Sequence, residues 1–354
     1  MMKRGKHTHN KESEDNLSQI PDSVLLHILS FLETKEAIRT SILSKRWKHL
    51  WKYLPTLTLN GRPFNYSKGF AKFVNRILSN RDSSTALQSL EFHNFGYNNL
   101  LKRISKYAVS HNIQRLQIHV ICDIERIPSC IFSCQTLTSL HLRVQPKFYP
   151  GTKPFPCSLN FPALTTLYLG YVAFSSKDNG LVEPFSECSK LSSLVISRCK
   201  VVDGQNLCIS STTLVNLTIR TYCNRKLAVL KFELNTPSLC SFDFSGIPLQ
   251  KFCGSNSSFT SLTHVSIFMW SISTDVPLVL LNWLIELANI KSLTISSSAL
   301  EVLSLVPDLL KAEFPSLYNL KLLKVKVNRL SSSAVPDGIV KFLIQNAPSA
   351  KVEI

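Results

Sequence analysis

The feature that most constrains this chain is a short apolar pattern that returns at a nearly constant interval. In each copy an apolar residue is followed, three and five positions later, by two more, as in Leu164, Leu167 and Leu169. Successive copies start 23 to 28 residues apart. The copies start at Leu87, Ile113, Leu137, Leu164, Leu191, Leu214, Leu239, Leu262, Ile290 and Leu317. A fixed period of this length is typical of repeat architectures, in which each unit packs on its neighbours.

The spacing within a copy predicts the local structure. The last two apolar positions are two residues apart, so in a β-strand both side chains turn to the same side. The residues that remain in each period are enough for a return through a helix or an irregular arc. No single unit can bury its own apolar side, so the units must stack. We therefore predict an α/β solenoid with a parallel sheet on its inner, concave curve.

The strand residues beside the buried pairs point the other way, toward the inner curve. They combine positive charge, imidazole and aromatic rings, a mixture that suits recognition of a protein or a small ligand. The alternative is a face that is merely solvated. The candidate binding residues on this face are Arg115, His119, His141, Arg143, Tyr168, Arg220, His264 and Phe268, and Lys321 is expected beside them in the last copy.

Residues 17–57 do not follow the repeat and predict three short helices. Pro21 and Asp22 can open the first, and Thr34 and Ser44 can cap the second and third. The apolar stripe of the third helix contains Trp47, Leu50, Trp51 and Leu54. A unit of about 40 residues buries too little surface to be comfortably stable alone. Its apolar residues are too many for contacts among three small helices, so some should await another protein.

This segment closely resembles the plant F-box. The residues that carry the resemblance are Ile20-Pro21, Ile28-Leu29-Ser30-Phe31-Leu32 and Leu43-Ser44-Lys45-Arg46-Trp47, with Ile20 where Leu is usual. The repeats over residues 87–325 are similar to the degenerate leucine-rich repeats of plant F-box proteins. The resemblance implies an α/β fold, in which a small N-terminal three-helix F-box precedes a leucine-rich-repeat horseshoe with a parallel sheet on its concave face.

The same resemblance implies a function. In the family, the F-box binds the Skp-type adaptor, and through it the cullin, of SCF (Skp–cullin–F-box) ubiquitin ligases, while the repeats hold the protein substrate. The contacts with the adaptor would come from Ile20, Pro21, Leu25, Ile28, Leu29, Leu32 and Leu43. Some relatives are small-molecule receptors of hormone type, in which a ligand completes the substrate surface. We keep that as the alternative, with Arg115, Arg143 and Arg220 as groups that could meet an anion.

We divide the chain into a disordered basic tail (1–16), the F-box (17–57) and a repeat solenoid with a C-terminal cap (58–354). The cap should contain a last helix at 338–346 and a last strand at 351–354. Some relatives carry a further C-terminal FBD module, and the residues after the repeats are too few to complete one. Helical stripes at 70–78 and 100–109 indicate a rigid joint between the two units rather than a flexible linker.

Composition limits the remaining function classes. The net charge is +17 but spread along the chain, so it does not by itself indicate nucleic-acid binding. The ten cysteines include no CxxC pair and are expected to be reduced and mostly buried. No catalytic motif, signal peptide or membrane-spanning segment is present. We expect a non-catalytic protein without cofactor or metal, in the nucleus or cytoplasm.

Overall fold

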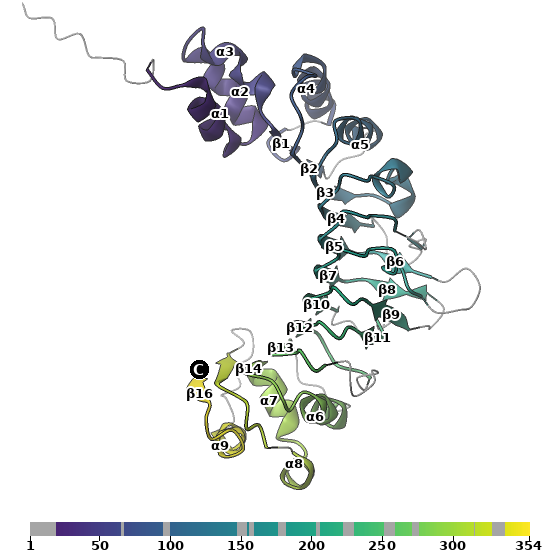
Figure 1. Cartoon of the computed structure of the whole chain (residues 1–354), viewed down its shortest axis with the longest axis vertical. Helices are drawn as coiled ribbons and strands as arrows, with labels where there is room; N and C mark the ends of the chain where they lie inside the picture. Colours follow the sequence, from purple (N-terminus) through teal and green to yellow (C-terminus); the bar gives the residue numbers. More distant parts are fainter. Residues whose placement is uncertain are drawn as a thin grey trace, which may run out of the picture.

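The chain forms an open arc, seen in a computed structural model (Figure 1). Helices lie at its N-terminal end, strands line the inner curve, and further helices and small strands lie outside. The structure describes residues 19–64, 67–94, 100–146, 154–155, 159–175, 182–202, 206–221, 230–250, 259–270, 276–314, 316–327 and 337–354. The tail at 1–16 lies outside these ranges.

The N-terminal unit is helical, as predicted. Its elements are α1 (Asp22–Ser30), α2 (Thr34–Arg39), the 3-10 helix η1 (Thr40–Ile42), α3 (Trp47–Leu50) and the 3-10 helix η2 (Trp51–Tyr53). The two predicted caps are wrong. Thr34 lies inside α2, where its hydroxyl accepts a hydrogen bond from the Thr58 N–H at 2.9 Å. Ser44 lies too far ahead of α3, which begins at Trp47 and has no side-chain cap.

Twelve strands in the described residues form one sheet, and every neighbouring pair is parallel. In sheet order they are β1 (Thr56–Asn60), β2 (Ser89–Asn94), β3 (Arg115–Ile121), β4 (Ser139–Gln145), β5 (Thr166–Gly170), β7 (Ser193–Ser197), β10 (Asn216–Arg220), β12 (Ser241–Ser245), β13 (His264–Phe268), β14 (Ser292–Ser296), β15 (Leu322–Lys326) and β16 (Lys351–Glu353). The predicted concave parallel sheet is confirmed.

The register stacks the apolar pairs of the repeats directly on one another. Leu167 of β5 lies between Leu140 and Leu194, and its neighbours are fully or almost fully buried like itself. Burying such a side chain stabilises the fold by about 1.5–3 kcal/mol. The stacked pairs therefore form the continuous core that holds the arc together.

The repeat frame predicted from the sequence is wrong at both ends of the sheet. An unrecognised first copy, Leu54, Leu57 and Leu59, is buried and supplies β1, so Leu54 ends the helical unit rather than extending its third helix. The last copy starts at Leu320 instead of Leu317, because Leu323 and Val325 are the pair that stacks on β14. Lys324, not Lys321, therefore continues the inner face.

The outer side of the arc changes along the chain (Figure 1). Next to the N-terminal unit it consists of α4 (Ser67–Asn80) and α5 (Leu100–Ser110), followed by the 3-10 helices η3 (Ile124–Arg126) and η4 (Ser129–Ile131). Two small parallel sheets follow, β6 (Ala173–Phe174) with β8 (Lys200–Val201) and β9 (Leu207–Ser210) with β11 (Phe232–Asn235). The C-terminal part has α6 (Pro277–Glu286), α7 (Ser297–Leu303), α8 (Pro307–Glu313) and α9 (Asp337–Gln345). The predicted joint helices, last helix and last strand are all present.

The helical unit and the repeats share one core. Leu25 of α1 and Ala347 after α9 belong to the same contiguous cluster of buried apolar residues. Polar contacts add to the joint: the buried Arg81 guanidinium donates to the Leu54 carbonyl at 3.0 Å, and Asn60 donates to the Glu33 carboxylate at 3.1 Å. The F-box-like helices are therefore attached rigidly to the first strands.

Candidate functional site

Two surfaces carry the features of a binding site, and the first lies on the N-terminal helices. Helix α1 is apolar on two sides. Leu25 and Leu29, one turn apart, are fully buried, whereas Val24 and Ile28, also one turn apart, are each 45 % exposed. One side of α1 therefore belongs to the core while the other faces water.

Exposed apolar residues continue from α1 into the following turns. We call the set the apolar ridge; it consists of Val24, Ile28, Phe31, Leu32, Ile42 and Leu43. Phe31 is 76 % and Ile42 is 89 % exposed. Several exposed large apolar side chains on one small unit are typical of an interaction site in a soluble protein.

The structure separates the predicted adaptor-contact residues into two groups. Ile28, Leu32 and Leu43 are exposed on the apolar ridge, and Pro21 is exposed at the start of α1. Leu25 and Leu29 are correctly placed on α1 but wrong as surface contacts, because they are completely buried. Ile20 is half-buried and packs against the core.

The sequence prediction missed three members of the ridge, Val24, Phe31 and Ile42. Val24, Ile28 and Phe31 are spaced four and three residues apart and so share one side of a helix. That spacing was readable from the sequence, but it did not show whether this side or the Leu25 side faces the core.

The ridge is held in place by polar contacts at its base. Arg46 forms an ion pair with Asp22 at 2.6 Å and donates to the carbonyl of Ile20, which fixes the start of α1 against the turn before α3. The Thr56 hydroxyl donates to the Ser30 carbonyl at 3.5 Å and so ties the end of α1 to β1.

The second surface is the concave face of the sheet, where rings stack across the strands. His93 and His119 stack with centroids 4.5 Å apart, and His141 and Tyr168 stack at 3.8 Å. His119 and His141 make a tilted contact at 4.6 Å, which joins the two pairs. We call these four residues the ring ladder.

Two imidazoles of the ring ladder, His119 and His141, are electrically neutral at physiological pH. Partial burial lowers the pKa of His119 to about 4, helped by the neighbouring His141 and His93. Partial burial likewise lowers the pKa of His141 to about 4, with the positive charge of Arg143 as the next cause. This part of the concave face is thus an aromatic surface rather than a cationic one.

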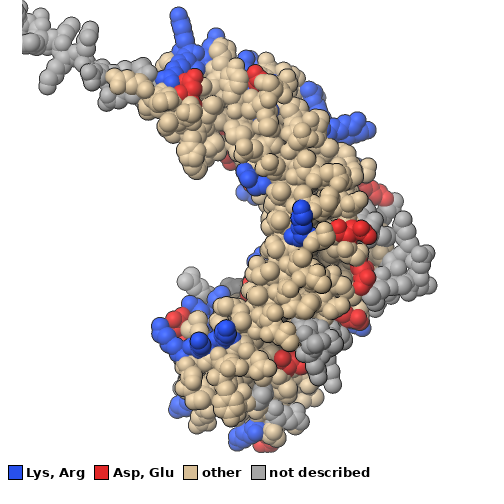
Figure 2. All heavy atoms as spheres, viewed as in Figure 1, with Lys and Arg blue, Asp and Glu red and all other residues tan. Residues whose placement is uncertain are grey.

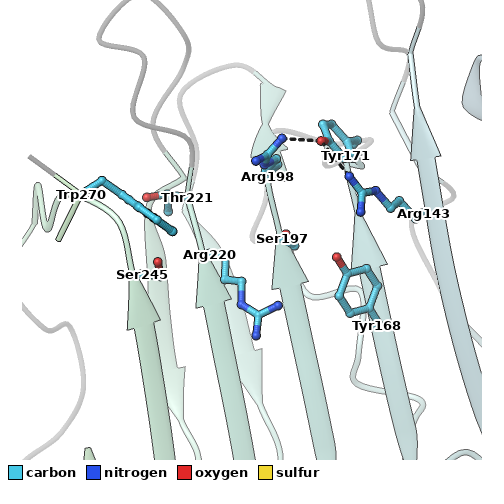
Figure 3. Close-up of a pocket in the computed structure, with 9 residues that line it drawn as sticks. All are labelled: Arg143, Tyr168, Tyr171, Ser197, Arg198, Arg220, Thr221, Ser245 and Trp270. Atoms are coloured by element: carbon cyan, nitrogen blue, oxygen red, sulfur yellow. Dashed lines mark hydrogen bonds between the residues drawn. The ribbon is translucent and has the colours of Figure 1, made fainter. Parts of the chain in front are cut away.

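A hollow of about 530 Å³ opens beside the ring ladder, at the end of the strands (Figure 3). We call it the basic pocket. Its lining combines the guanidinium groups, aromatic rings and small hydroxyl residues Arg143, Arg198, Arg220, Tyr168, Tyr171, Trp270, Ser197, Thr221 and Ser245. In the part of the chain that the structure describes, no carboxylate contributes to this lining.

The Tyr171 hydroxyl links two of the arginines. Arg198 donates to it at 2.5 Å and Arg143 at 3.3 Å, and both guanidinium groups also lie over its ring. Figure 3 shows this connected group on one side of the hollow, while Arg220 reaches in from the neighbouring strand and Trp270 lies beside Thr221.

Backbone geometry forms the rim of the basic pocket. Tyr171 and Arg198 occupy the same position in successive repeats and have positive φ angles of 63° and 55°. Such a conformation costs about 1–2 kcal/mol for a residue with a Cβ. Each bend is held by a backbone N–H that donates to the next strand, Tyr171 to Ser197 and Arg198 to Arg220.

At two positions near the basic pocket, a glycine leaves space that a side chain would otherwise fill. Gly170 lies between Arg143 and Ser197 in the register, so no side chain separates them. Gly246 has a φ of 155°, and a Cβ there would lie 1.8 Å from the Thr221 hydroxyl oxygen. A larger residue at position 246 would therefore clash with Thr221, which lines the hollow.

The structure brings together some of the predicted concave residues and not others. His119, His141 and Tyr168 meet in the ring ladder, and Arg143, Tyr168 and Arg220 meet in the basic pocket. Phe268 contacts Trp270 with ring centroids 4.8 Å apart, edge to face. Arg115 and His264 are exposed at the first positions of β3 and β13, and neither lines the basic pocket.

The prediction missed Tyr171, Arg198 and Trp270, because it considered only strand positions and these residues follow their strands. Aligning the repeats would have placed Tyr171 beside Arg198. At the bend after β7, the Cys199 thiol satisfies a backbone acceptor, since it donates to the Leu169 carbonyl at 3.4 Å. Burial raises the pKa of this thiol to about 12, and all the described cysteines are free.

The described residues contain no group of three or more His, Cys, Asp or Glu placed to hold a metal ion. Among them there is also no helix with the length and hydropathy of a membrane span.

Comparison with known proteins agrees with both regions. Residues 17–58 match the F-box domain, and residues 101–242 match the family described as "FBD-associated F-box protein At5g56370, LRR repeats". The chain is 31 % identical over 237 residues to the putative F-box/FBD/LRR-repeat protein At4g00315 of Arabidopsis thaliana, an alignment that covers 64 % of this chain and 52 % of the relative.

Two other Arabidopsis thaliana proteins extend this comparison. The putative F-box/FBD/LRR-repeat protein At4g13965 is 32 % identical over 67 % of this chain and 55 % of its own length. The F-box/LRR-repeat protein At4g14103 is 26 % identical over 97 % of this chain and 91 % of its own length. The chain thus spans little more than half the length of the first two relatives. With an F-box domain at its N-terminal helices and leucine-rich repeats in its parallel sheet, the chain belongs to the plant F-box/LRR-repeat family.

Proposed function

We propose that this protein is the substrate-recognition subunit of an SCF ubiquitin ligase. Its F-box binds a Skp-type adaptor, and through it a cullin, while the concave face of the repeats binds a target protein. The observation that carries the proposal is the apolar ridge, because it leaves six apolar side chains in water on a unit whose own core is already filled.

Burial of the ridge would supply the affinity for the adaptor. An apolar side chain that moves from water into a protein interface gains about 1.5–3 kcal/mol if it becomes fully buried. Ile42, Phe31 and Leu43 are the most exposed of the ridge residues and have the most to gain. A helical unit that presents apolar anchors from consecutive turns fits insertion into a groove on the partner.

The rigid joint suits the task of presenting a target. The helices and the repeats share one core, so the concave face stays at a fixed position relative to the ridge. A fixed position raises the effective concentration of the target near a conjugating enzyme held by the same complex. In this role the chain positions a reaction and catalyses none itself.

The functional division that we propose follows the sequence ranges 17–57 for the F-box and 58–354 for the repeats. Strand β1 starts at Thr56, so the last residues of the F-box range already belong to the sheet. We place the complex in the nucleus or cytoplasm, where ubiquitin ligases of this type act.

The test is adaptor binding by a ridge variant. Replacing Ile42 and Leu43 by Asp puts charge on two exposed positions and should weaken binding to a purified Skp-type adaptor by about a hundredfold or more, as at interface hot spots. Isothermal titration calorimetry measures the loss. The matched control is Leu278→Asp on α6, because Leu278 is 54 % exposed but lies far from the ridge. Unchanged binding by the ridge variant would overturn the proposal.

A second candidate function is a small-molecule receptor, which one observation favours. The basic pocket is concave, lies on the surface proposed for the target and has a volume in the range of small-ligand sites. A ligand held there would form part of the target-binding surface. A rise in melting temperature of the protein in the presence of the ligand would support this function, since a ligand that binds only the folded state stabilises it.

A further inference from the structure

We propose that the outer side of α4 and α5 is a docking face for an acidic segment of the adaptor that the apolar ridge binds. The proposal rests on the proposed function, from which it takes that an adaptor is held by the N-terminal helices. It adds a second contact, in which charge rather than apolar burial meets the same partner. We call this surface the outer basic face; it consists of Lys68, Lys72, Arg76, Lys102, Arg103 and Lys106.

Much of the net charge of the chain is concentrated in this region. Residues 45–110 contain twelve Lys and Arg against two Asp and Glu, which gives +10 of the +17 of the whole chain. The two carboxylates lie off the face. Glu91 is on the inner side of β2, 2.8 Å from His93, and Asp82 follows α4 and accepts from the Ser84 N–H. Helices α4 and α5 themselves contain no acidic residue.

Both helices turn one side to the core and the charged side to water. Phe70, Val74 and Ile77 of α4 are buried, as are Ile104 and Ala108 of α5. The six residues of the outer basic face are all exposed. Lys and Arg side chains stand out from the outer edge of the arc over these two helices (Figure 2).

The two helices are held side by side, and most of the charges on them are unpaired. Arg103 of α5 donates to the Asn75 side chain of α4 at 2.8 Å and to the Ser79 hydroxyl at 3.2 Å. Among the residues that the structure describes, no carboxylate forms an ion pair with the other five members of the face. These five charges are therefore open to a partner.

Folding alone does not account for this arrangement. On α4, Lys72 is four residues from both Lys68 and Arg76. On α5, Lys102 is four residues from Lys106. Like charges at this spacing are neighbours on the helix surface and destabilise the helix. Lys68 and Lys102 also lie in the first turns of their helices, where the helix dipole disfavours positive charge. A negatively charged partner would offset both penalties.

The position of the face selects the adaptor as this partner. The face lies outside the arc, away from the concave sheet that we assign to the target (Figure 1). It adjoins the F-box helices at two places. The Phe64 ring contacts Phe70 of α4 with centroids 5.2 Å apart, and the Lys35 ammonium of α2 lies 4.7 Å from the Phe64 centroid. After α4, the Asp82 N–H donates to the Lys52 carbonyl at 3.1 Å.

The side chains of the face favour carboxylates over nucleic acid. Four of the six are Lys, whose ammonium is a compact point charge, whereas the planar fork of Arg is suited to phosphate. Arg103 is already engaged between the helices. The aromatic side chains described on these helices are also engaged, because Phe73 contacts Phe64 and Tyr107 stacks on His111. They offer no free ring on which a base could stack.

The experiment is a stopped-flow measurement of association between the full chain and a purified Skp-type adaptor over a range of salt concentrations. Charge complementarity acts mainly on the association rate and is screened by salt. The test variant combines Lys72→Gln, Lys102→Gln and Lys106→Gln. Its association rate at low salt should be about tenfold below that of the unaltered protein, and the difference should shrink as the salt concentration rises.

The matched control combines Lys291→Gln, Lys311→Gln and Lys341→Gln at the C-terminal end of the arc. It removes the same charge from exposed positions far from the face. Its association rate should fall by less than about twofold, since screening confines the effect of a charge to its surroundings. Equal losses in the two variants would indicate a response to total charge. That result, or an unchanged association rate in the test variant, would overturn the proposal.

The melting temperature distinguishes docking from a structural role of the lysines. Because the three substitutions of the test variant remove repulsion between like charges, this variant should melt at the same temperature as the unaltered protein or at a higher one. A lower melting temperature would show that the lysines serve the fold, and it would contradict the argument from unfavourable charge placement.

Two further comparisons separate this proposal from the F-box assignment and from another partner. If the Ile42→Asp and Leu43→Asp variant loses the adaptor while the lysine variant associates normally, only the outer basic face is refuted. Absence of adaptor binding by the unaltered protein would refute both proposals. Short duplex DNA at physiological salt is the probe for nucleic acid. DNA binding that the lysine variant loses, with its adaptor association unchanged, would assign the face to nucleic acid instead.

Discussion

The N-terminal helices and the repeat sheet differ in how they expose their apolar residues. The sheet hides nearly all of them, and its concave face carries rings, hydroxyls and charges. The helices leave a ridge of them in water, with Ile42 89 % exposed. The difference indicates two kinds of partner: one that is held by apolar burial and one that is chosen by polar and aromatic contacts.

The geometry of the two elements explains this contrast. A parallel strand alternates its side chains, so the repeats can bury one side completely and leave the other free for polar residues. Helix α1 is nine residues long and has apolar residues on two sides, of which the small unit can cover only one. Figure 2 shows that charged side chains are scattered over most of the arc, which agrees with local sites rather than one extended charged surface.

The largest effect should come from the buried side of the sheet. Leu194→Ala removes a fully buried side chain from the middle of the stack and should lower the free energy of unfolding by about 2–5 kcal/mol. Val195→Ala, on the neighbouring residue that faces the inner curve, should cost less than about 1 kcal/mol. Urea unfolding of both variants measures the difference. Equal losses would mean that the two sides of the sheet do not differ as described.

A comparison within α1 sharpens the contrast between core and ridge. Leu29→Ala should destabilise the protein by about 2–4 kcal/mol because Leu29 is fully buried. Ile28→Ala should change the free energy of unfolding by less than about 1 kcal/mol, because Ile28 is 45 % exposed, yet weaken adaptor binding. Thermal unfolding and calorimetric titration separate the two properties. A stable Ile28 variant with undiminished adaptor binding would remove Ile28 from the interface.

A substitution at the joint between the two regions should have a smaller effect on the free energy of unfolding. Thr34→Val removes the buried hydroxyl that accepts from the Thr58 N–H and should cost about 1–3 kcal/mol. Thr40→Val is the matched control, since the Thr40 hydroxyl bonds only within its own segment, to Ala37. Hydrogen exchange of the Thr58 amide should become faster in the Thr34 variant alone. If both variants behave alike, this bond does not hold the joint.

The last expected effect concerns pH. His119 and His141 each have a pKa of about 4 in the folded protein, below the ordinary value of 6.5. The unfolded chain therefore takes up these protons first, and stability is lost as pH falls from about 6.5 toward 4. Replacing both residues by Gln should make the melting temperature less dependent on pH in that window. A pH dependence as steep as in the unaltered protein would show that other groups cause it.

Much of the fold was predictable because the repeat spacing sets which residues are buried. In the large sheet, the strands from β2 to β14 follow the predicted copies, since a shift of one residue would turn the apolar pairs outward. The ends were harder to place. Leu317 and Leu320 both fit the start of a copy, and only stacking on β14 selects Leu320.

The candidate sites were less predictable, for physical reasons that particular residues illustrate. On α1 the Leu25 and Ile28 sides are equally apolar, so no amphipathic pattern says which one is inside. Tyr171 and Arg198 point to the basic pocket because of their backbone conformation at the bend, and a strand pattern carries no information about that. Thr34 is of a residue type that often caps helices. Its hydroxyl instead accepts a hydrogen bond from the N–H of Thr58 in β1, 24 residues further along the chain.

Hydrogen–deuterium exchange of the full chain with and without a Skp-type adaptor tests the central claim most directly. Helix α1 and the turn around Ile42 and Leu43 should gain protection from exchange, because the adaptor covers the ridge there. The strands around the basic pocket should keep the exchange rates of the free protein. Protection of those strands instead of the helices, or no protection in either region, would contradict the assignment of the two surfaces.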